Sequence, residues 1–333
     1  MNAIAEPEAQ KTTPSRTSRR APFAVKTPRH EYHESVLLTE TVGLLEPGAG
    51  KLIVDGTLGG GGHSAALLAA GARVIGLDQD PDAIAYASGR LAAFGSNFTP
   101  VHSSFVNVRE VLDSLQIASI NGALLDLGVS SHQIDVAERG FSFMQDGPLD
   151  MRMDPGSPLS AADLVNTMSS EQLERIFRSH GEEPAARKIA LRLVRDRMVR
   201  PFTTTLQLAE SIESVVPRHG KTHPATRVFQ ALRIAVNREL EVLEQALLAF
   251  SSVLAPGGRF AVITFHSLED RIVKAFFSNR SAEWLDRPEW PAPRRNPDFT
   301  FKRITRKALV ASEAEQRANP RSRSAKLRVV EKL

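Results

Sequence analysis

The sequence contains no cysteine among its 333 residues, and this absence excludes several kinds of chemistry. Disulfide bonds, zinc–thiolate sites, thiol redox reactions and cysteine nucleophiles all need a thiol. No apolar run approaches the ~20 residues of a membrane-spanning helix. We therefore expect a cytoplasmic protein that does not associate with a membrane, and nothing in the sequence indicates a metal site.

The first 29 residues have no apolar periodicity and no hydrophobic region of the kind found in a secretory signal. They contain four prolines and six basic residues, so we expect a disordered N-terminal extension. The rest of the chain can bury a core, because 42% of all residues are hydrophobic. The net charge is only +4, yet residues 294–328 hold eleven Lys or Arg against three acids. Such a run is either a solvated tail or an RNA-facing surface.

The most informative stretch is residues 51–64. An apolar run ends at Asp55, and five glycines follow within residues 56–62. An Ala/Leu-rich segment, residues 63–70, then reads as a helix. A strand, a glycine turn and a helix N-terminus together let a ligand approach bare backbone N–H groups.

Strands and helices alternate from residue 51 to residue 135. We expect strands at residues 51–55, 73–78, 98–102 and 122–126, with helices at residues 63–70, 81–93 and 105–115. This alternation predicts an α/β fold with a parallel sheet covered on both faces. Three of the strands end in Asp55, Asp78 and Asp126, and ligands bind beyond the carboxyl ends of such strands. We therefore expect the three acids to converge on one site.

The alternation stops near residue 137, where an irregular loop and several helical patterns begin. A long helix is expected over residues 225–252, a Pro-Gly-Gly turn at residues 256–258 and a fifth strand at residues 259–264. Two more strands are expected near residues 299–304 and 326–330, as a terminal hairpin. The prediction is a seven-stranded Rossmann-like core, residues 30–136 and 236–333, with residues 137–235 inserted as a helical substrate-recognition domain.

Both hydride transfer and methyl transfer fit a glycine turn followed by an acid 19 residues after Gly59. Three details favour S-adenosylmethionine as the cofactor over a dinucleotide. Asp55 would repel a pyrophosphate but attract a sulfonium or ammonium group. Ser64 stands where a dinucleotide fold expects Gly or Ala. The Pro-Gly-Gly turn and the terminal hairpin suit the seven-stranded methyltransferase sheet.

The missing thiol also restricts the acceptor. Methylation at carbon 5 of a pyrimidine usually needs a cysteine that adds to the ring, whereas an amine or hydroxyl can attack the methyl group directly. Such in-line attack without a covalent enzyme intermediate depends mainly on positioning. Asp126 and the backbone that follows it are suitably placed to accept the N–H groups of an exocyclic amine.

From about His33 to the C-terminus, the chain resembles the bacterial small-subunit (16S) ribosomal RNA cytosine-N4 methyltransferases, the RsmH or MraW family. The motifs that carry the resemblance occur in order along the chain. They are residues 55–64, 78–81, 124–133, 138–143, 147–153, 223–227, 265–271 and 319–321. The resemblance implies a class I methyltransferase sheet with an inserted helical domain, and a cytidine of the decoding region as substrate.

Carried over position by position, the resemblance implies a set of cofactor contacts. They are Gly61, Gly62, His63, Asp78, Phe105, Asp126 and Gln133. The glycines, Asp78 and Asp126 were already indicated by the strand and turn pattern, whereas Phe105 without the family reads as a core residue. Asp126 is also the candidate for positioning the target amine, and no general base is assigned.

Six residues in motifs away from the glycine turn are candidate RNA contacts. They are Arg139, Arg152, His223, Arg227, His266 and Arg321. For each arginine, a structural ion pair explains the residue as well as an RNA contact does. For His266, the alternative to an RNA contact is a core histidine whose hydrogen bonds are satisfied within the protein. The expected partner is small-subunit ribosomal RNA or the assembled small subunit, and a homodimer is permitted. The competing functions are a non-catalytic ribosome-assembly factor and, less favoured, an NAD-dependent dehydrogenase.

Overall fold

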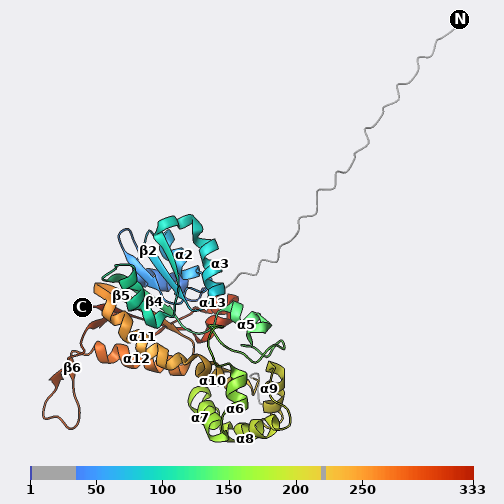
Figure 1. Ribbon diagram of the computed structural model, residues 1–333. Coiled ribbons are helices and arrows are strands. Elements are labelled where there is room, and N and C mark those ends of the chain that lie inside the picture. The colour runs from blue at the N-terminus through green and yellow to red at the C-terminus, as the bar shows by residue number, and fades with distance from the viewer. Residues whose placement is uncertain (2–34, 219–222) are drawn as a thin grey trace. The chain divides into compact units, whose positions relative to one another are not determined.

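The computed structural model describes Met1 and residues 35–218 and 223–333 (Figure 1). Residues 35–218 and 223–333 belong to one compact unit. The N-terminal extension predicted for residues 1–29 lies, apart from Met1, outside the described residues. None of the described helices is long and apolar enough to cross a membrane.

A central sheet organises the compact unit, in the order β3-β2-β1-β4-β5-β10-β8 with β9 beside β10. Its first five strands are parallel, and β10 is antiparallel to both of its main neighbours. This order confirms the predicted Rossmann-like methyltransferase sheet, with one extra short strand. The strands are β1 Leu52–Asp55, β2 Arg73–Asp78, β3 Phe98–His102, β4 Ile120–Asp126, β5 Leu254–Thr264, β8 Phe301–Arg303, β9 Leu309–Val310 and β10 Lys326–Lys332.

Helices cover both faces of the sheet because neighbouring strand residues point to opposite sides. In β1, Ile53 belongs to one hydrophobic cluster and Val54 to the other, and Leu124 and Leu125 divide in the same way in β4. One face packs against α4 Val108–Ser114, α11 Glu239–Val253 and α12 Ser267–Arg280. The other packs against α1 Leu38–Leu45, α2 Gly62–Ala69 and α3 Pro81–Leu91.

A group of helices beside the sheet has a hydrophobic cluster of its own, which runs from Leu149 to Leu232 (Figure 1). The large buried side chains Phe177 and Phe229 lie within it. The helices of this group are α6 Ala161–Thr167, α7 Ser170–Gly181, α8 Ala186–Arg197, α9 Thr205–Glu213 and α10 Thr226–Asn237. Three of them, α6, α7 and α9, begin with a Ser or Thr cap whose side chain accepts a backbone N–H three residues on. The boundaries of the inserted domain, residues 137–235, stay a prediction.

The prediction of one helix over residues 225–252 was wrong. The chain forms α10 and α11, with Arg238 between them in the left-handed region at φ 50°. Asn237, the last residue of α10, accepts the Met153 N–H at 2.8 Å and donates to the Met151 carbonyl at 2.8 Å. These tertiary contacts fix the position of the break between the two helices. No glycine or proline at this position indicates the break in the sequence.

Smaller differences affect other predicted boundaries. The helix expected from residue 105 begins at Val108, after a 3₁₀ turn over Phe105–Asn107. Residues 256–258 lie within β5 as an irregularity, because Ile120 pairs with Leu254 and Gly122 with Arg259. A further two-stranded ribbon, β6 Trp284–Leu285 with β7 Arg294–Arg295, was not predicted.

Candidate active site

The glycine turn after β1 is held against the neighbouring strands by backbone hydrogen bonds. Gly56 N–H donates to the Leu124 carbonyl at 2.8 Å, and Leu58 N–H donates to the Leu77 carbonyl at 2.9 Å. A Cβ on Gly56 would lie 2.6 Å from Leu125 Cδ2, so a side chain there would collide with the core. The turn then enters α2 through Gly61, whose φ of 73° suits glycine.

Asp55 lies at the carboxyl end of β1, where its carboxylate is buried. Ser64 Oγ donates to one oxygen at 2.7 Å, and the Thr57 N–H donates to the other at 3.2 Å. Burial raises the pKa of Asp55 to about 6, although these two hydrogen bonds act in the opposite direction. Ser64, first noted as a departure from a dinucleotide pattern, therefore helps to hold the acid.

Asp78 ends β2 and holds the same turn from the other side. Its Oδ2 accepts the Gly59 N–H at 2.8 Å, and its Oδ1 accepts the Asp80 N–H at 2.9 Å. Burial is the main reason that the pKa of Asp78 is raised to about 6. Each carboxylate oxygen has a second lone pair, so Asp78 can still accept hydroxyl groups of a ribose.

Asp126 ends β4, and its backbone N–H donates to Thr57 Oγ1 at 2.6 Å. The pKa of its carboxyl is raised well above the usual value by burial, and further by the charges of Asp55 and Glu269. Among the described residues its buried Oδ1 has no hydrogen-bond partner, whereas Oδ2 lies 3.6 Å from His63 Nδ1. The charge of Asp55 acts on both Asp78 and Asp126, so the three strand-end acids lie near one another, although only Asp78 and Asp126 line the pocket.

Gln133 and Arg139 meet at another buried acid, Asp80. Gln133 Nε2 donates to Asp80 Oδ2 at 2.9 Å, and Arg139 Nη1 donates to the same oxygen at 2.7 Å. Gln133 also accepts the Ser130 N–H at the start of α5 Ser131–Asp135. The network fixes α5 beside the N-terminus of α3.

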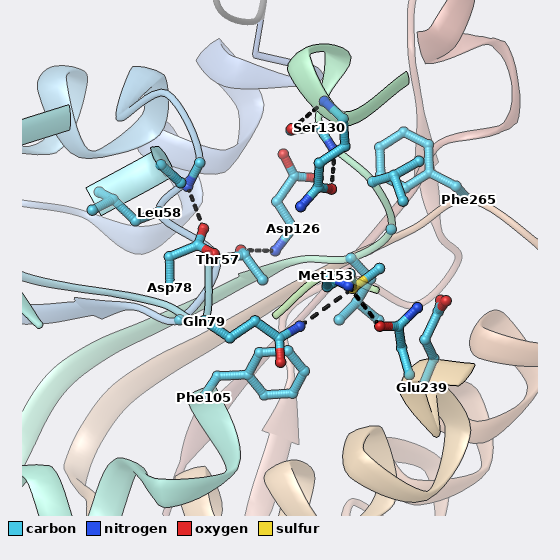
Figure 2. Close-up of a pocket in the computed structure, with 18 of the residues that line it drawn as sticks. Thr57, Leu58, Asp78, Gln79, Phe105, Asp126, Ser130, Met153, Glu239 and Phe265 are labelled. Atoms are coloured by element: carbon cyan, nitrogen blue, oxygen red, sulfur yellow. Dashed lines mark hydrogen bonds between the residues drawn. The ribbon is translucent and has the colours of Figure 1, made fainter. Parts of the chain in front are cut away.

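One pocket brings most of these residues together (Figure 2). In this view Asp126 lies between Asp78 and Phe265, and Phe105 lies below them. The lining includes six of the seven predicted cofactor residues, namely Gly62, His63, Asp78, Phe105, Asp126 and Gln133. Gly61 is not in that lining, because its Cα faces Leu91 of α3. Each cofactor contact stays a prediction.

The pocket wall also contains residues that the sequence did not indicate as site residues. They are chiefly Met153, Asn237, Glu239, Phe265 and Glu269. Phe265 and Glu269 belong to a motif that had been noted, and Glu269 accepts the N–H groups of Phe265 and His266. Met153 ends another noted motif, and its N–H donates to Asn237. Asn237 and Glu239 come from the break between α10 and α11, for which no local signal exists.

Glu239, His266 and Glu269 place their ligand atoms within 4.8 Å of one another, a spacing that could hold a metal ion. Arg233, however, donates to both oxygens of Glu239 at 2.9 Å each. Burial raises the pKa of Glu269, but His266 and Arg233 outweigh it, so that the net shift is downward. Arg233 pairs with Glu239 and helps to lower the pKa of Glu269, so this group resembles a buried ion-pair network.

The six candidate RNA contacts do not form one surface of free side chains. Arg139 is 12% exposed and donates to Asp80 and to two backbone carbonyls. Arg152 forms a bidentate pair with Asp150. For both arginines the geometry favours the ion-pair alternative. His266 caps α12 with its side chain 10% exposed, as the core alternative supposed.

Of the remaining three candidates, Arg227 and Arg321 are more open. Arg227 is exposed and donates to the Glu182 carbonyl at 3.3 Å. Arg321 is 36% exposed and pairs with Asp135 of α5 at 2.9 Å. His223 packs against Phe143, with the ring centroids 4.7 Å apart. RNA contact by any of the six stays a prediction.

Comparison with known proteins identifies the family. The model of the MraW methylase family matches residues 30–333. The chain belongs to this family. Two relatives are named ribosomal RNA small subunit methyltransferase H. The chain is 52% identical over 312 residues to the one from Magnetococcus marinus and 51% over 304 residues to the one from Carboxydothermus hydrogenoformans. Each comparison covers 90% of this chain and 98% of the relative.

Membership of the MraW methylase family confirms that the chain is a methyltransferase and that S-adenosylmethionine is its cofactor. The dehydrogenase alternative is therefore set aside. The pocket fits this cofactor, because glycines of the turn line it and the buried acids Asp78 and Asp126 suit a ligand with positive groups. Asp78 would hold the ribose, Phe105 would pack on the adenine, and the turn before α2 would hold the methionine end.

Proposed function

We propose that this methyltransferase transfers a methyl group to the exocyclic N4 of a cytidine in the decoding region of small-subunit ribosomal RNA. The amine attacks the methyl group in line, without a covalent enzyme intermediate. The names of the relatives support the RNA substrate, and the missing cysteine supports direct attack. The choice of N4 rests on the family resemblance of the motifs and on the chemistry of Asp126.

The observation that carries this proposal is the free Oδ1 of Asp126. A buried carboxylate oxygen without a partner is costly, and an arriving N–H group would satisfy it. An exocyclic amine has a delocalised lone pair, and a hydrogen bond from its N–H to a carboxylate makes that lone pair more available. A hydroxyl or ring-carbon acceptor would give Asp126 no comparable pair of hydrogens.

We further propose that residues 137–235 recognise the RNA. On α8, Arg187, Lys188 and Arg195 are exposed, while Ile189 and Leu193 pack into the helical cluster. Exposed basic side chains on one helix suit the phosphate backbone, which supplies most of the sequence-independent affinity. The proposed contact surface includes Arg227 and the basic stretch near Arg321.

The test is methylation with labelled S-adenosylmethionine, using small-subunit RNA and assembled small subunits as separate substrates. The label is expected on N4 of one cytidine, located by mass mapping of RNA fragments. Asp126→Asn is expected to lower turnover far more than RNA affinity. A label on another atom, or on protein only, would contradict the proposal, and equal losses of turnover and affinity would make Asp126 structural.

A further inference from the structure

His63 lies in the first turn of α2, where it is 5% exposed. Its Nε2 lies 3.1 Å from the Val36 carbonyl. A carbonyl oxygen only accepts, so Nε2 carries a proton and donates it. In the neutral imidazole, Nδ1 is then unprotonated, and this is the nitrogen that lies 3.6 Å from Asp126 Oδ2.

A neutral imidazole and an ionised carboxylate would place two acceptors against each other in this buried contact. The contact becomes favourable when one proton lies between Nδ1 and Oδ2. Besides His63 from α2, the titratable groups that act on Asp126 are Asp55 from β1 and Glu269 from α12, and both are acids. His63 is therefore the basic group placed to hold the proton while Asp126 carries its charge.

We propose that His63 is a positioning residue that carries a proton on Nδ1 and forms an ion pair with Asp126, keeping Asp126 Oδ1 free as the acceptor for the substrate amine. This inference deepens the proposed function and rests on it for the identity of the amine. The backbone carbonyl of Val36 supports it, because that hydrogen bond orients the imidazole with Nδ1 toward the acid.

The bond from carbon to sulfur breaks with its electrons left on sulfur, and the N4 lone pair forms the new bond to the methyl carbon. The methylated nitrogen loses one proton, which Asp126 Oδ1 accepts. His63 keeps its proton on Nδ1 throughout, so Asp126 is an anion when the amine arrives. Solvent takes the surplus proton after product leaves.

The first experiment needs neither RNA nor cofactor. Nitrogen-15 NMR of the histidine rings follows the titration of His63 in the wild type and in Asp126→Asn, and His63→Gln assigns the signal among the nine histidines. We expect the His63 titration midpoint to fall by at least about one pH unit in Asp126→Asn, a tenfold loss of proton affinity. An unchanged midpoint would overturn the inference.

The second experiment compares two replacements that each keep one half of the imidazole. His63→Gln retains a donor near the Nε2 position and loses the group facing Asp126. His63→Asn retains a donor near the Nδ1 position and loses the contact with Val36. In single turnover at saturating cofactor, we expect His63→Gln to be slower by roughly 100-fold and to lose the titration of His63 from its pH–rate profile. His63→Asn should recover part of the rate.

Cofactor affinity, measured by calorimetry, separates the proposed role from damage to the pocket. Because His63 is itself a predicted cofactor contact, the affinity should change to a similar extent in both variants, whereas their rates should differ. An equal loss of rate in the two variants, with the wild-type pH profile retained, would overturn the inference. If the wild type methylates an atom other than N4, the proposed function fails, while the NMR titration still decides whether the pair exists.

Discussion

Neutralising Asp55 should stabilise the protein without its cofactor, because the fold buries this acid at a cost. The perturbation is Asp55→Asn, whose amide can accept the Thr57 N–H and donate to Ser64 Oγ, the two groups that contact the acid now. The pKa of Asp55 is raised from 3.8 to about 6 in the folded protein. That difference of about 2 units corresponds to ~3 kcal/mol at ~1.4 kcal/mol per unit.

The sign of the pH dependence follows from the direction of the shift. The folded state holds the Asp55 proton more tightly than the unfolded chain does. Protonated Asp55 therefore contributes its full stabilisation of the folded state below pH 3.8, and this contribution is lost as the pH rises through about 6. The gain from Asp55→Asn should be ~2 kcal/mol at pH 7.5, after roughly 1 kcal/mol is allowed for weaker hydrogen bonds. At pH 5 the cost of ionising Asp55 is only ~1.6 kcal/mol, so the gain should fall to roughly 0.6 kcal/mol.

Urea unfolding at the two pH values measures this gain. Far-ultraviolet circular dichroism is the suitable signal, because both tryptophans, Trp284 and Trp290, lie in the β6–β7 segment away from Asp55. Asp113→Asn is the matched control, since Asp113 is a 63% exposed acid and should change stability by less than ~0.5 kcal/mol. An Asp55→Asn variant that is less stable than the wild type at pH 7.5, or equally affected at both pH values, would refute the reasoning.

Three further predictions concern other charged groups. Asp78→Ala should weaken cofactor binding by roughly 1–3 kcal/mol, since a buried acceptor is lost; unchanged affinity in calorimetry would count against a ribose contact. Arg139→Ala should lower the free energy of unfolding by about 3 kcal/mol in urea, because Asp80 stays buried without its ion pair, and a loss under 1 kcal/mol would indicate a solvated arginine. Neutralising Arg321 and Arg323 together should flatten the salt dependence of RNA affinity, whereas an unaltered slope would indicate a solvated tail.

Much of the sheet could be predicted because its signals are local. A buried strand, a turn and an acid occupy adjacent positions, so the ends of β1, β2 and β4 were located from a few residues each. Their convergence followed from the geometry of parallel strands alone. The glycine turn could also be predicted from the sequence. Position 56 requires glycine, because a Cβ there would collide with the Leu125 side chain.

The other half of the pocket could not be predicted, because it depends on contacts between distant segments. The break between α10 and α11 is fixed when Asn237 bonds to Met153, 84 residues earlier in the chain. Arg139 likewise finds its partner Asp80 at a separation of 59 residues. A sequence pattern identifies such an arginine as important but does not distinguish a buried ion pair from an RNA contact.

The arrangement of acids explains why the site suits a ligand with positive charge. Asp55, Asp78 and Asp126 are all buried, and the charge of Asp55 raises the pKa of both of the others. Without a ligand, ionised Asp55 therefore makes Asp78 and Asp126 harder to ionise. A bound group with a positive charge would reverse this effect and lower all three pKa values. Stability and binding are thus opposed at the same three residues: a change that relieves the repulsion in the free protein also removes the charge that attracts the cofactor.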